Sequence, residues 1–268
     1  MRIVEYRIFV PFRWDQCRIA SAYSVNRRTK DETGGGDGFE ILSRRDFVED
    51  GNPGHYVERV LHFKKQVPKS VSWAIPNKYA HLHEDNSNAF PHTVTTFQCE
   101  GMGDNMLLHT ETRHVKYEKS MELPKNLLRL TDEELGMREI VYLDLLNGPE
   151  SKKKEFNLKG FSNPDAGILE MKAPSNRVDD QQIPEWVQYY EGEITVVVKV
   201  VKFLFKWRGI QTFLENFVAK NVFYHTYLDT HRAMVKWSTE WSQMTIDEVF
   251  VMEGEIQKEL SQEDLDRS

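Results

Sequence analysis

A lysine, an arginine and a glutamate each interrupt an otherwise apolar row of side chains. Lys199 lies within residues 195–207, where the alternate positions of an expected strand are otherwise Thr, Val, Phe or Trp. Arg59 interrupts a similar row over residues 57–63, and Glu253 falls within the apolar stripe of an expected C-terminal helix. An unpaired buried charge costs several kcal/mol, so each of these groups needs a partner. Recognition of an amphiphile fits this pattern, because its anionic group would pair with the lysine inside an apolar cavity.

Each of these residues also has a plainer explanation. Lys199 could lie along apolar surface with its ammonium in water at a sheet edge. Glu253 could be a polar exception on a helix face that is otherwise buried. Two apolar strand rows that each hold one cation are nevertheless harder to explain in this way than a single row. The residues alone therefore leave both interpretations open.

Other kinds of site find less support in the sequence. The glycines of residues 34–38 are not followed by Gly-Lys-Ser/Thr, and they do not fit G-x-G-x-x-G. His81 and His83 lack companions at metal-ligand spacing, and Cys17 and Cys99 have no neighbours typical of a nucleophile. A pair of glycosidase carboxylates is a spatial feature, which the sequence leaves open. We expect no metal, no cofactor and no enzyme activity.

Composition limits the class of protein. The chain has 268 residues, 40% of them hydrophobic and 12% aromatic, which suffices for a packed core. Its formal net charge of −7 argues against a nucleic-acid partner. The first residues lack the continuous apolar segment of a signal peptide, and no apolar run is long enough to span a bilayer. With only two cysteines and no disulfide framework, we expect a cytoplasmic protein.

Hydrophobic periodicity predicts the elements that position these residues. A dense cluster of turn residues at 49–54 predicts a hairpin with a long loop, and four or five strands in succession indicate an antiparallel meander. Residues 149–185 show no sustained period and are predicted to form a long excursion. Thr245 and Glu248 form a capping-box pattern that begins a C-terminal helix over residues 245–262. Strands are expected at residues 2–10, 39–43, 56–63, 93–99, 106–112, 139–146 and from 194, with helices at 15–28 and 210–241, the second of which could contain a break.

The sequence resembles the phosphatidylinositol transfer proteins, specifically their short single-domain class. Order and spacing agree over residues 2–148 and 188–257, which makes the match specific. The matching segments include EYRIFVPF at 5–12, AYSVN at 22–26, ETGGGDGFEIL at 32–42, HEDNSNAFPHTVT at 83–95, TETRH at 110–114, KFLFKWRGIQTFLENF at 202–217, HRAMVKW at 231–237 and MTIDEVFVME at 244–253.

The resemblance implies a fold and a function. The fold class would be α+β: a START-like or Bet v 1-like curved, mainly antiparallel sheet wrapped on long helices around a lipid cavity. Residues 1–268 would form a single lipid-transfer domain that exchanges phosphatidylinositol or phosphatidylcholine between membranes. The protein would be a monomer that touches membrane surfaces transiently, with the phospholipid as its cargo. The alternative is a START-like lipid sensor or presenter that acts through a protein partner, at the divergent residues 149–185.

The resemblance also implies roles for individual residues. The lipid phosphate would be held by Lys199, Thr95, Thr112 and Ser21, the last of which replaces a longer glutamine. The inositol headgroup would meet Val57, Arg59, Glu84, Asn88 and Glu253. The family's paired tryptophans at the membrane-docking turn correspond to Trp207 and Arg208. Val57 cannot hydrogen-bond an inositol hydroxyl, and Arg59 presents a planar fork where the family has a lysine. The regulatory loop of the family has no counterpart in residues 149–185, so no phosphorylation site is carried over.

Overall fold

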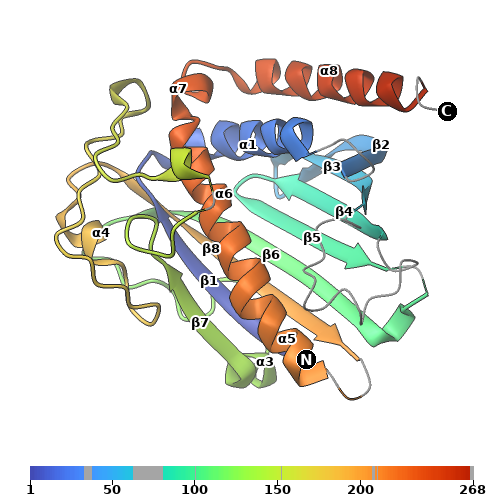
Figure 1. Ribbon diagram of the computed structural model, residues 1–268, viewed down its shortest axis with the longest axis horizontal. Helices are drawn as coiled ribbons and strands as arrows, with labels where there is room; N and C mark the ends of the chain where they lie inside the picture. Colours follow the sequence, from blue (N-terminus) through green and yellow to red (C-terminus); the bar gives the residue numbers. More distant parts are fainter. Residues whose placement is uncertain are drawn as a thin grey trace.

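The computed structural model describes residues 1–32, 38–62, 81–99, 101–151, 153–206, 209 and 211–265. These residues form an α+β fold in which helices cover one face of a large sheet (Figure 1). The strands are β1 (Arg2–Val10), β2 (Gly38–Glu49), β3 (Asn52–His62), β4 (His81–Ala89), β5 (His92–Gln98), β6 (Met106–Tyr117), β7 (Arg138–Leu143) and β8 (Ile194–Phe205).

The sheet has the order β2-β3-β4-β5-β6-β8-β1-β7, which places the long apolar strand β8 between β6 and β1. The predicted antiparallel meander is confirmed for β2 to β6. The strand predicted at residues 139–146 is not part of it, because β7 pairs in parallel with β1 at the far edge. Periodicity carries no information on pairing direction, which explains this difference. β7 ends at Leu143 because the Asp144 carboxylate then accepts bonds from the Leu146 and Asn147 amides, at 2.9 and 3.0 Å.

The hairpin between β2 and β3 is tighter than the sequence suggested. The prediction of a long loop at residues 49–54 was wrong, since the strands turn over Asp50 and Gly51, with φ of 50° and 81°. An Asp-Gly pair is favoured in such a turn because both residues must adopt positive φ. Pro53 is tolerated near the start of β3, because pairing with β4 begins only at His55. β4 itself was missed as a strand, since most of its residues are polar.

The long helices form a layer on one face of the sheet, where α6 lies over β1 and β8 and α1 lies beside α8 (Figure 1). The helix predicted over residues 210–241 is interrupted, first by a π-helical segment and then at Trp237. The predicted start of the last helix is confirmed, because Thr245 and Glu248 form both capping bonds. The α-helices are α1 (Cys17–Glu32), α3 (Asp132–Met137), α4 (Glu185–Tyr189), α5 (Gln211–Phe217), α6 (Tyr224–Lys236), α7 (Ser238–Trp241) and α8 (Ile246–Leu265); the π-helix is η6 (Val218–Phe223), and 3-10 turns are η1 (Trp14–Gln16), η3 (Gly103–Asn105), η4 (Lys154–Phe156) and η5 (Pro164–Ala166).

The hydrophobic core covers both faces of β1 and β8, because most residues of these two strands are buried. Tyr6 and Phe203 are fully buried on the strands, and Trp241 is buried on the helix side. The described residues of 149–185 belong to the same core, although the helical segments among them, η4 and η5, are short. Their apolar side chains pack into it, including Leu158, Ala166, Ile168 and Met171. The excursion therefore forms part of the packed body of the protein.

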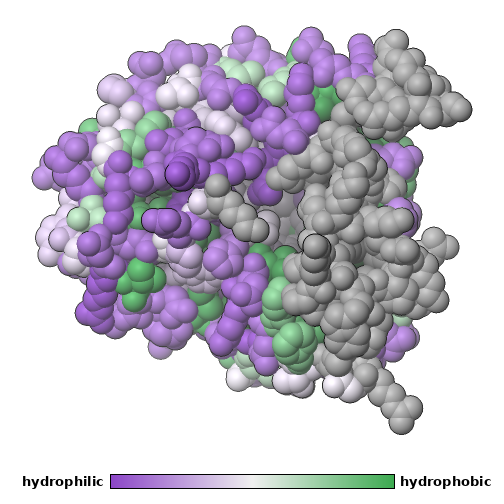
Figure 2. All heavy atoms as spheres, viewed as in Figure 1, coloured by the Kyte–Doolittle hydropathy of each residue, from purple (hydrophilic) through white to green (hydrophobic). Residues whose placement is uncertain are grey.

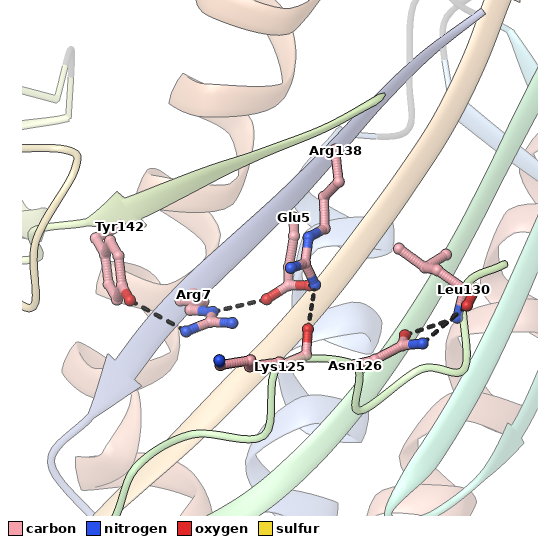
Figure 3. A network of polar contacts seen from close by, with 7 residues as sticks. All are labelled: Glu5, Arg7, Lys125, Asn126, Leu130, Arg138 and Tyr142. Atoms are coloured by element: carbon pink, nitrogen blue, oxygen red, sulfur yellow. Dashed lines mark hydrogen bonds and ion pairs between the residues drawn. The ribbon is translucent and has the colours of Figure 1, made fainter. Parts of the chain in front are cut away.

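The opposite face of β1 carries a buried network of charges (Figure 3). The Glu5 carboxylate accepts bonds from Arg7 at 2.6 Å and from Arg138 at 2.7 Å. Arg7 also donates to the Tyr142 hydroxyl at 3.1 Å, and Arg138 donates to the Lys125 carbonyl at 2.6 Å. The Glu5 carboxylate thus joins β1 to β7 on the face away from α6, and Arg138 extends the network to the segment that leads to β7.

Candidate functional site

Strand register brings polar side chains into rows on the helix-covered face of the sheet. Side chains two residues apart share a face, so the directly paired residues of neighbouring strands extend each row. The first row is Lys199, Thr112, Thr93, Asn88 and His55. The second row is Thr110, Thr95, Asn86, Val57 and Arg44. The third joins Glu84 to Arg59. The structure therefore places on one face all the strand residues that the sequence predicted for the phosphate and the headgroup.

Side-chain hydrogen bonds join neighbouring residues within the first two rows. Lys199 Nζ donates to Thr112 Oγ1 at 2.6 Å. Asn86 Nδ2 donates to Thr95 Oγ1 at 2.8 Å, and Thr93 Oγ1 donates to Asn88 Oδ1 at 3.0 Å. The face is thus a continuous polar surface of hydroxyls and amides with the lysine ammonium at one end.

The Lys199 ammonium is set into the protein beside an aromatic ring. Its Nζ lies 5.1 Å from the ring centroid of Tyr227, which α6 places over the sheet. Burial lowers the pKa of Lys199 to about 8, and the nearby Glu84 charge opposes that change. Within the described part of the chain, Lys199 forms no ion pair with a carboxylate. An anion placed beside Thr112 would supply the missing countercharge.

The two histidines near Lys199 carry no charge at neutral pH. Burial lowers the pKa of His114 to about 4 and that of His231 to about 3, with the Lys199 charge acting in the same direction. His231 Nδ1 lies 2.7 Å from the Tyr227 carbonyl, which fixes the imidazole in the helix layer. Of these three basic groups, only Lys199 therefore offers a full positive charge to an anion.

If Lys199 pairs with a lipid phosphate, as the sequence predicts, lipid binding should depend on pH. Without ligand, Lys199 has a pKa of about 8, below its ordinary 10.5. An anionic phosphate favours the charged lysine, so we expect phospholipid affinity to be constant below pH 8 and to fall up to about tenfold per pH unit above it. The stability of the lipid-free protein should instead rise from pH 8 to 10.5, because the folded state binds fewer protons than the unfolded state there. Measuring the phospholipid affinity and the free energy of unfolding as functions of pH over this range tests the predicted fall in affinity and the predicted rise in stability.

Two arginines on β2 and β3 hold the carboxylates of the site. Arg59 forms a bidentate ion pair with Glu84, with N–O distances of 2.8 and 2.9 Å. Arg44 pairs with Glu253 of α8 at 2.8 Å. The sequence predicted three of these residues as headgroup contacts and missed Arg44, which becomes visible only when β2 is paired with β3. Both carboxylates therefore already have partners, so a headgroup would share them with the arginines.

Helix α8 closes the site over β2 and β3. The Phe250 ring lies 4.0 Å from the His55 ring, beside the Arg44–Glu253 pair. Asn26 Nδ2 of α1 donates to the Val249 carbonyl at 2.9 Å, which fixes α8 against α1. Ser21 is half-buried on α1 and does not belong to the polar rows of the sheet. The structure thus brings Glu253 to the predicted site and leaves Ser21 in the helix layer.

The predicted docking residues Trp207 and Arg208 lie outside the described residues, as does most of the glycine-rich segment.

Several residues of the candidate site were missed in the sequence analysis. Asn86 lies between the predicted residues Glu84 and Asn88 on the same face of β4, and it was missed because the mostly polar β4 was not recognised as a strand. The others depend on pairing between distant segments: Arg44, Thr93, Thr110 and Tyr227.

The polar surface changes to an apolar one along β6 and β8. Beyond Thr110 the paired residues are Leu108 with Phe203, followed by Met106 with Phe205. This change lies toward the end of β8, where the chain continues to α5. An amphiphile would therefore place its headgroup at the polar rows and its acyl chains toward the β8–α5 end.

These features define an α+β protein whose helix-covered sheet face suits an amphiphile with an anionic group. The family profile described as phosphatidylinositol transfer protein matches residues 1–258, and the chain belongs to this family. It is 29% identical over 262 residues to phosphatidylinositol transfer protein 2 of Dictyostelium discoideum, covering 97% of this chain and 96% of the relative. The human phosphatidylinositol transfer protein beta isoform is 28% identical over 258 residues, covering 96% and 93%.

The described residues also bear on metal sites and on membrane-spanning helices. They contain no cluster of three or more His, Cys, Asp or Glu side chains arranged to hold a metal ion. Among the helices described, none combines the length and the apolar character needed to cross a bilayer.

Proposed function

We propose that this chain binds one phospholipid between its sheet and its helices and exchanges it between membranes. The observation that carries the proposal is the Lys199 ammonium, which is set beside Thr112 at the end of a hydroxyl-rich surface. Membership of the phosphatidylinositol transfer protein family supports the same function. The family is one of transfer proteins, and exchange makes and breaks no covalent bond. The protein would act as a monomer in the cytoplasm, touching membranes only transiently.

The proposed phosphate site consists of Lys199, Thr112 and Thr95. The ammonium would pair with the phosphate, while the two hydroxyls donate hydrogen bonds to its oxygens. Charge-assisted bonds of this kind are about twice as strong as neutral ones. Ser21 would approach from the helix side. Because every glycerophospholipid carries this phosphate, the group would set affinity and leave headgroup selectivity to other residues.

The proposed headgroup site lies beyond the phosphate on β3, β4 and α8. Arg59, Glu84, Asn88 and Glu253 offer donors and acceptors to the hydroxyls of an inositol ring. Val57 offers none, although it pairs directly with Asn86 in the middle of this surface. We therefore propose phosphatidylinositol and phosphatidylcholine as ligands, with a weakened inositol preference. A START-like arrangement would enclose the lipid, with α8 as the capping helix and Trp207 and Arg208 at the membrane.

Restoring a hydroxyl at Val57 tests the headgroup assignment. Val57→Thr should raise phosphatidylinositol binding several-fold and leave phosphatidylcholine nearly unchanged, because one neutral hydrogen bond contributes about 0.5–1.5 kcal/mol. The matched control is Val94→Thr on β5, which pairs with Glu111 on the opposite face of the sheet. Competitive loading from mixed vesicles, read by lipid mass spectrometry, gives the ratio. An equal shift for both lipids would show that Val57 does not face the headgroup.

Lipid content and transfer test the function itself. Native mass spectrometry of the purified protein should show one phospholipid per chain, since a lipid-sized void would be unfavourable in a close-packed interior. Labelled lipid should then move from donor to acceptor vesicles at a rate that depends on protein concentration. A chain that loads lipid without transferring it would act as a lipid sensor or presenter. A chain that shows only the apo mass and no transfer would refute the proposal.

A further inference from the structure

Arg44 lies at the edge of the proposed headgroup site, opposite α8. It ends the second polar row of the sheet, because Arg44 of β2 pairs with Val57 of β3. Helix α8 has mostly hydrophilic residues on its outer side (Figure 2), whereas its Glu253 accepts a bond from Arg44 Nη2 at 2.8 Å. The Arg44 and Glu253 side chains are only 28% and 20% exposed, so water screens the ion pair incompletely. The guanidinium is thus a fixed positive charge beside the position proposed for a headgroup.

The carboxylates that the described strands and α8 place beside this position already have partners. Arg59 holds Glu84 through two bonds, and Arg44 holds Glu253. Asp46 contacts a histidine ring at 2.7 Å, but its side chain is 84% exposed, so water weakens its attraction for a further cation. A positively charged headgroup would therefore meet two guanidinium groups, and it would compete with them for the partly buried carboxylates.

Neutral and cationic headgroups differ in how they fit this arrangement. The hydroxyls of a neutral headgroup both donate and accept hydrogen bonds, so they can bind a guanidinium and a carboxylate without separating the ion pair. A quaternary ammonium has no N–H to donate, so it needs a free carboxylate or an aromatic cage. Lys199 already offers a positive charge for the lipid phosphate at the other end of the polar surface. The charges of the site therefore balance for a phosphodiester whose headgroup is neutral.

We propose that Arg44 determines headgroup selectivity by withholding Glu253 from cationic headgroups. This inference rests on the proposed function, and it names the class of lipid that the site favours: a phosphodiester with a neutral, hydroxylated headgroup. Val57 and Arg44 then act in opposite directions on the balance between the two proposed ligands. Val57 removes a hydrogen bond to inositol, while Arg44 disfavours choline.

Loading the full chain from vesicles of mixed composition tests the role of Arg44. The vesicles contain phosphatidylinositol and phosphatidylglycerol, whose headgroups are neutral, together with phosphatidylcholine and phosphatidylethanolamine, whose headgroups are cationic. Arg44→Gln frees the Glu253 carboxylate, so both cationic headgroups should gain about fivefold over both neutral ones. Lipid mass spectrometry of the loaded protein measures this ratio. An unchanged ratio, or a gain for choline without a gain for ethanolamine, would overturn the proposal.

Control variants separate the charge of Arg44 from a structural role. Arg45→Gln makes the same change at the next residue of β2, whose guanidinium lies over the Tyr56 ring on the opposite face, 4.2 Å from the ring centroid. This variant should keep the parental ratio, and a shift equal to that of Arg44→Gln would contradict the proposal. Arg44→Lys keeps a positive charge beside Glu253, so its ratio should stay within about twofold of the parental one. If Arg44 serves only to fix α8, Arg44→Gln should lower the loading of all lipids equally, which would also contradict the proposal.

The parent protein distinguishes failure of this inference from failure of the proposed function. If the parent loads and transfers lipid while Arg44→Gln keeps the parental lipid ratio, the selective role of Arg44 is wrong and the transfer function stands. If the parent itself neither loads nor transfers lipid, the proposed function is wrong, and the role of Arg44 fails with it.

Discussion

Lys199→Met should reduce the loading of every phospholipid class together. The substitution removes the ammonium and keeps most of the apolar volume, so a bound phosphate would lie buried without its cation. Leaving one member of such a pair unpaired costs about 2–5 kcal/mol, which corresponds to a loss of roughly 30-fold or more in affinity. Competitive loading from mixed vesicles, followed by lipid mass spectrometry, measures the loss for each class.

The matched control is Lys202→Met, three positions further along the same strand. Lys202 points to the opposite face, where its Nζ pairs with Glu134 at 2.5 Å. The change in charge and composition is identical, but the helix-covered face of the sheet stays intact. Phospholipid loading should therefore remain at the parental level. Similar losses for the two variants would indicate a general effect of net charge on vesicle encounter.

The stability of the lipid-free protein distinguishes a loss of lipid binding from a loss of folding. Burial depresses the pKa of Lys199 to about 8, so the buried ammonium destabilises the lipid-free fold at neutral pH. Lys199→Met should therefore unfold at the same urea concentration as the lipid-free parent or a higher one. If the variant is stable but carries no lipid, the loss of lipid is due to the missing phosphate contact. Retention of phosphatidylcholine by Lys199→Met would place the phosphate elsewhere.

The sequence predicted those parts of the fold that are encoded locally. Alternation in residues 195–207 placed Lys199 on the same face as the buried Val197 and Val201, and the structure agrees. The Thr245–Glu248 pattern predicted the start of α8 within one residue, because capping depends on neighbouring residues. β4 was missed for a corresponding reason, since its hydrogen-bonding polar side chains lack the apolar alternation of a half-buried strand.

The pairing of charges could not be predicted in this way. Arg59 and Glu84 are 25 residues apart, and Arg44 and Glu253 are 209 apart. Their contacts depend on strand register and on the path of α8, which no local pattern specifies. The resemblance to the family supplied the roles of Glu84 and Glu253 but gave no indication of Arg44. The candidate headgroup site was therefore predicted as a set of residues, without the ion pairs that connect them.

Among the variants proposed for this protein, the one that removes the Glu5 charge should lose the most stability. Glu5 is 3% exposed and compensates two arginines that are themselves largely buried (Figure 3). Glu5→Gln keeps the size of the side chain but leaves both guanidinium groups without their carboxylate. Breaking a buried ion pair from one side typically costs about 3–5 kcal/mol, so we expect a decrease of this size in the free energy of unfolding in urea.

Asp15→Asn is the matched control for Glu5→Gln. Asp15 accepts two bonds from Arg13, at 3.0 and 3.1 Å, but the two side chains are 62% and 52% exposed. An exposed ion pair contributes about 0–1 kcal/mol, so this carboxylate-to-amide change should hardly move the transition. The network lies on the face of β1 that points away from Lys199. The folded fraction of Glu5→Gln should therefore bind the lipid classes in the same ratio as the parent. A loss below about 1 kcal/mol would show that the two arginines find other partners, because an uncompensated buried charge cannot be that inexpensive.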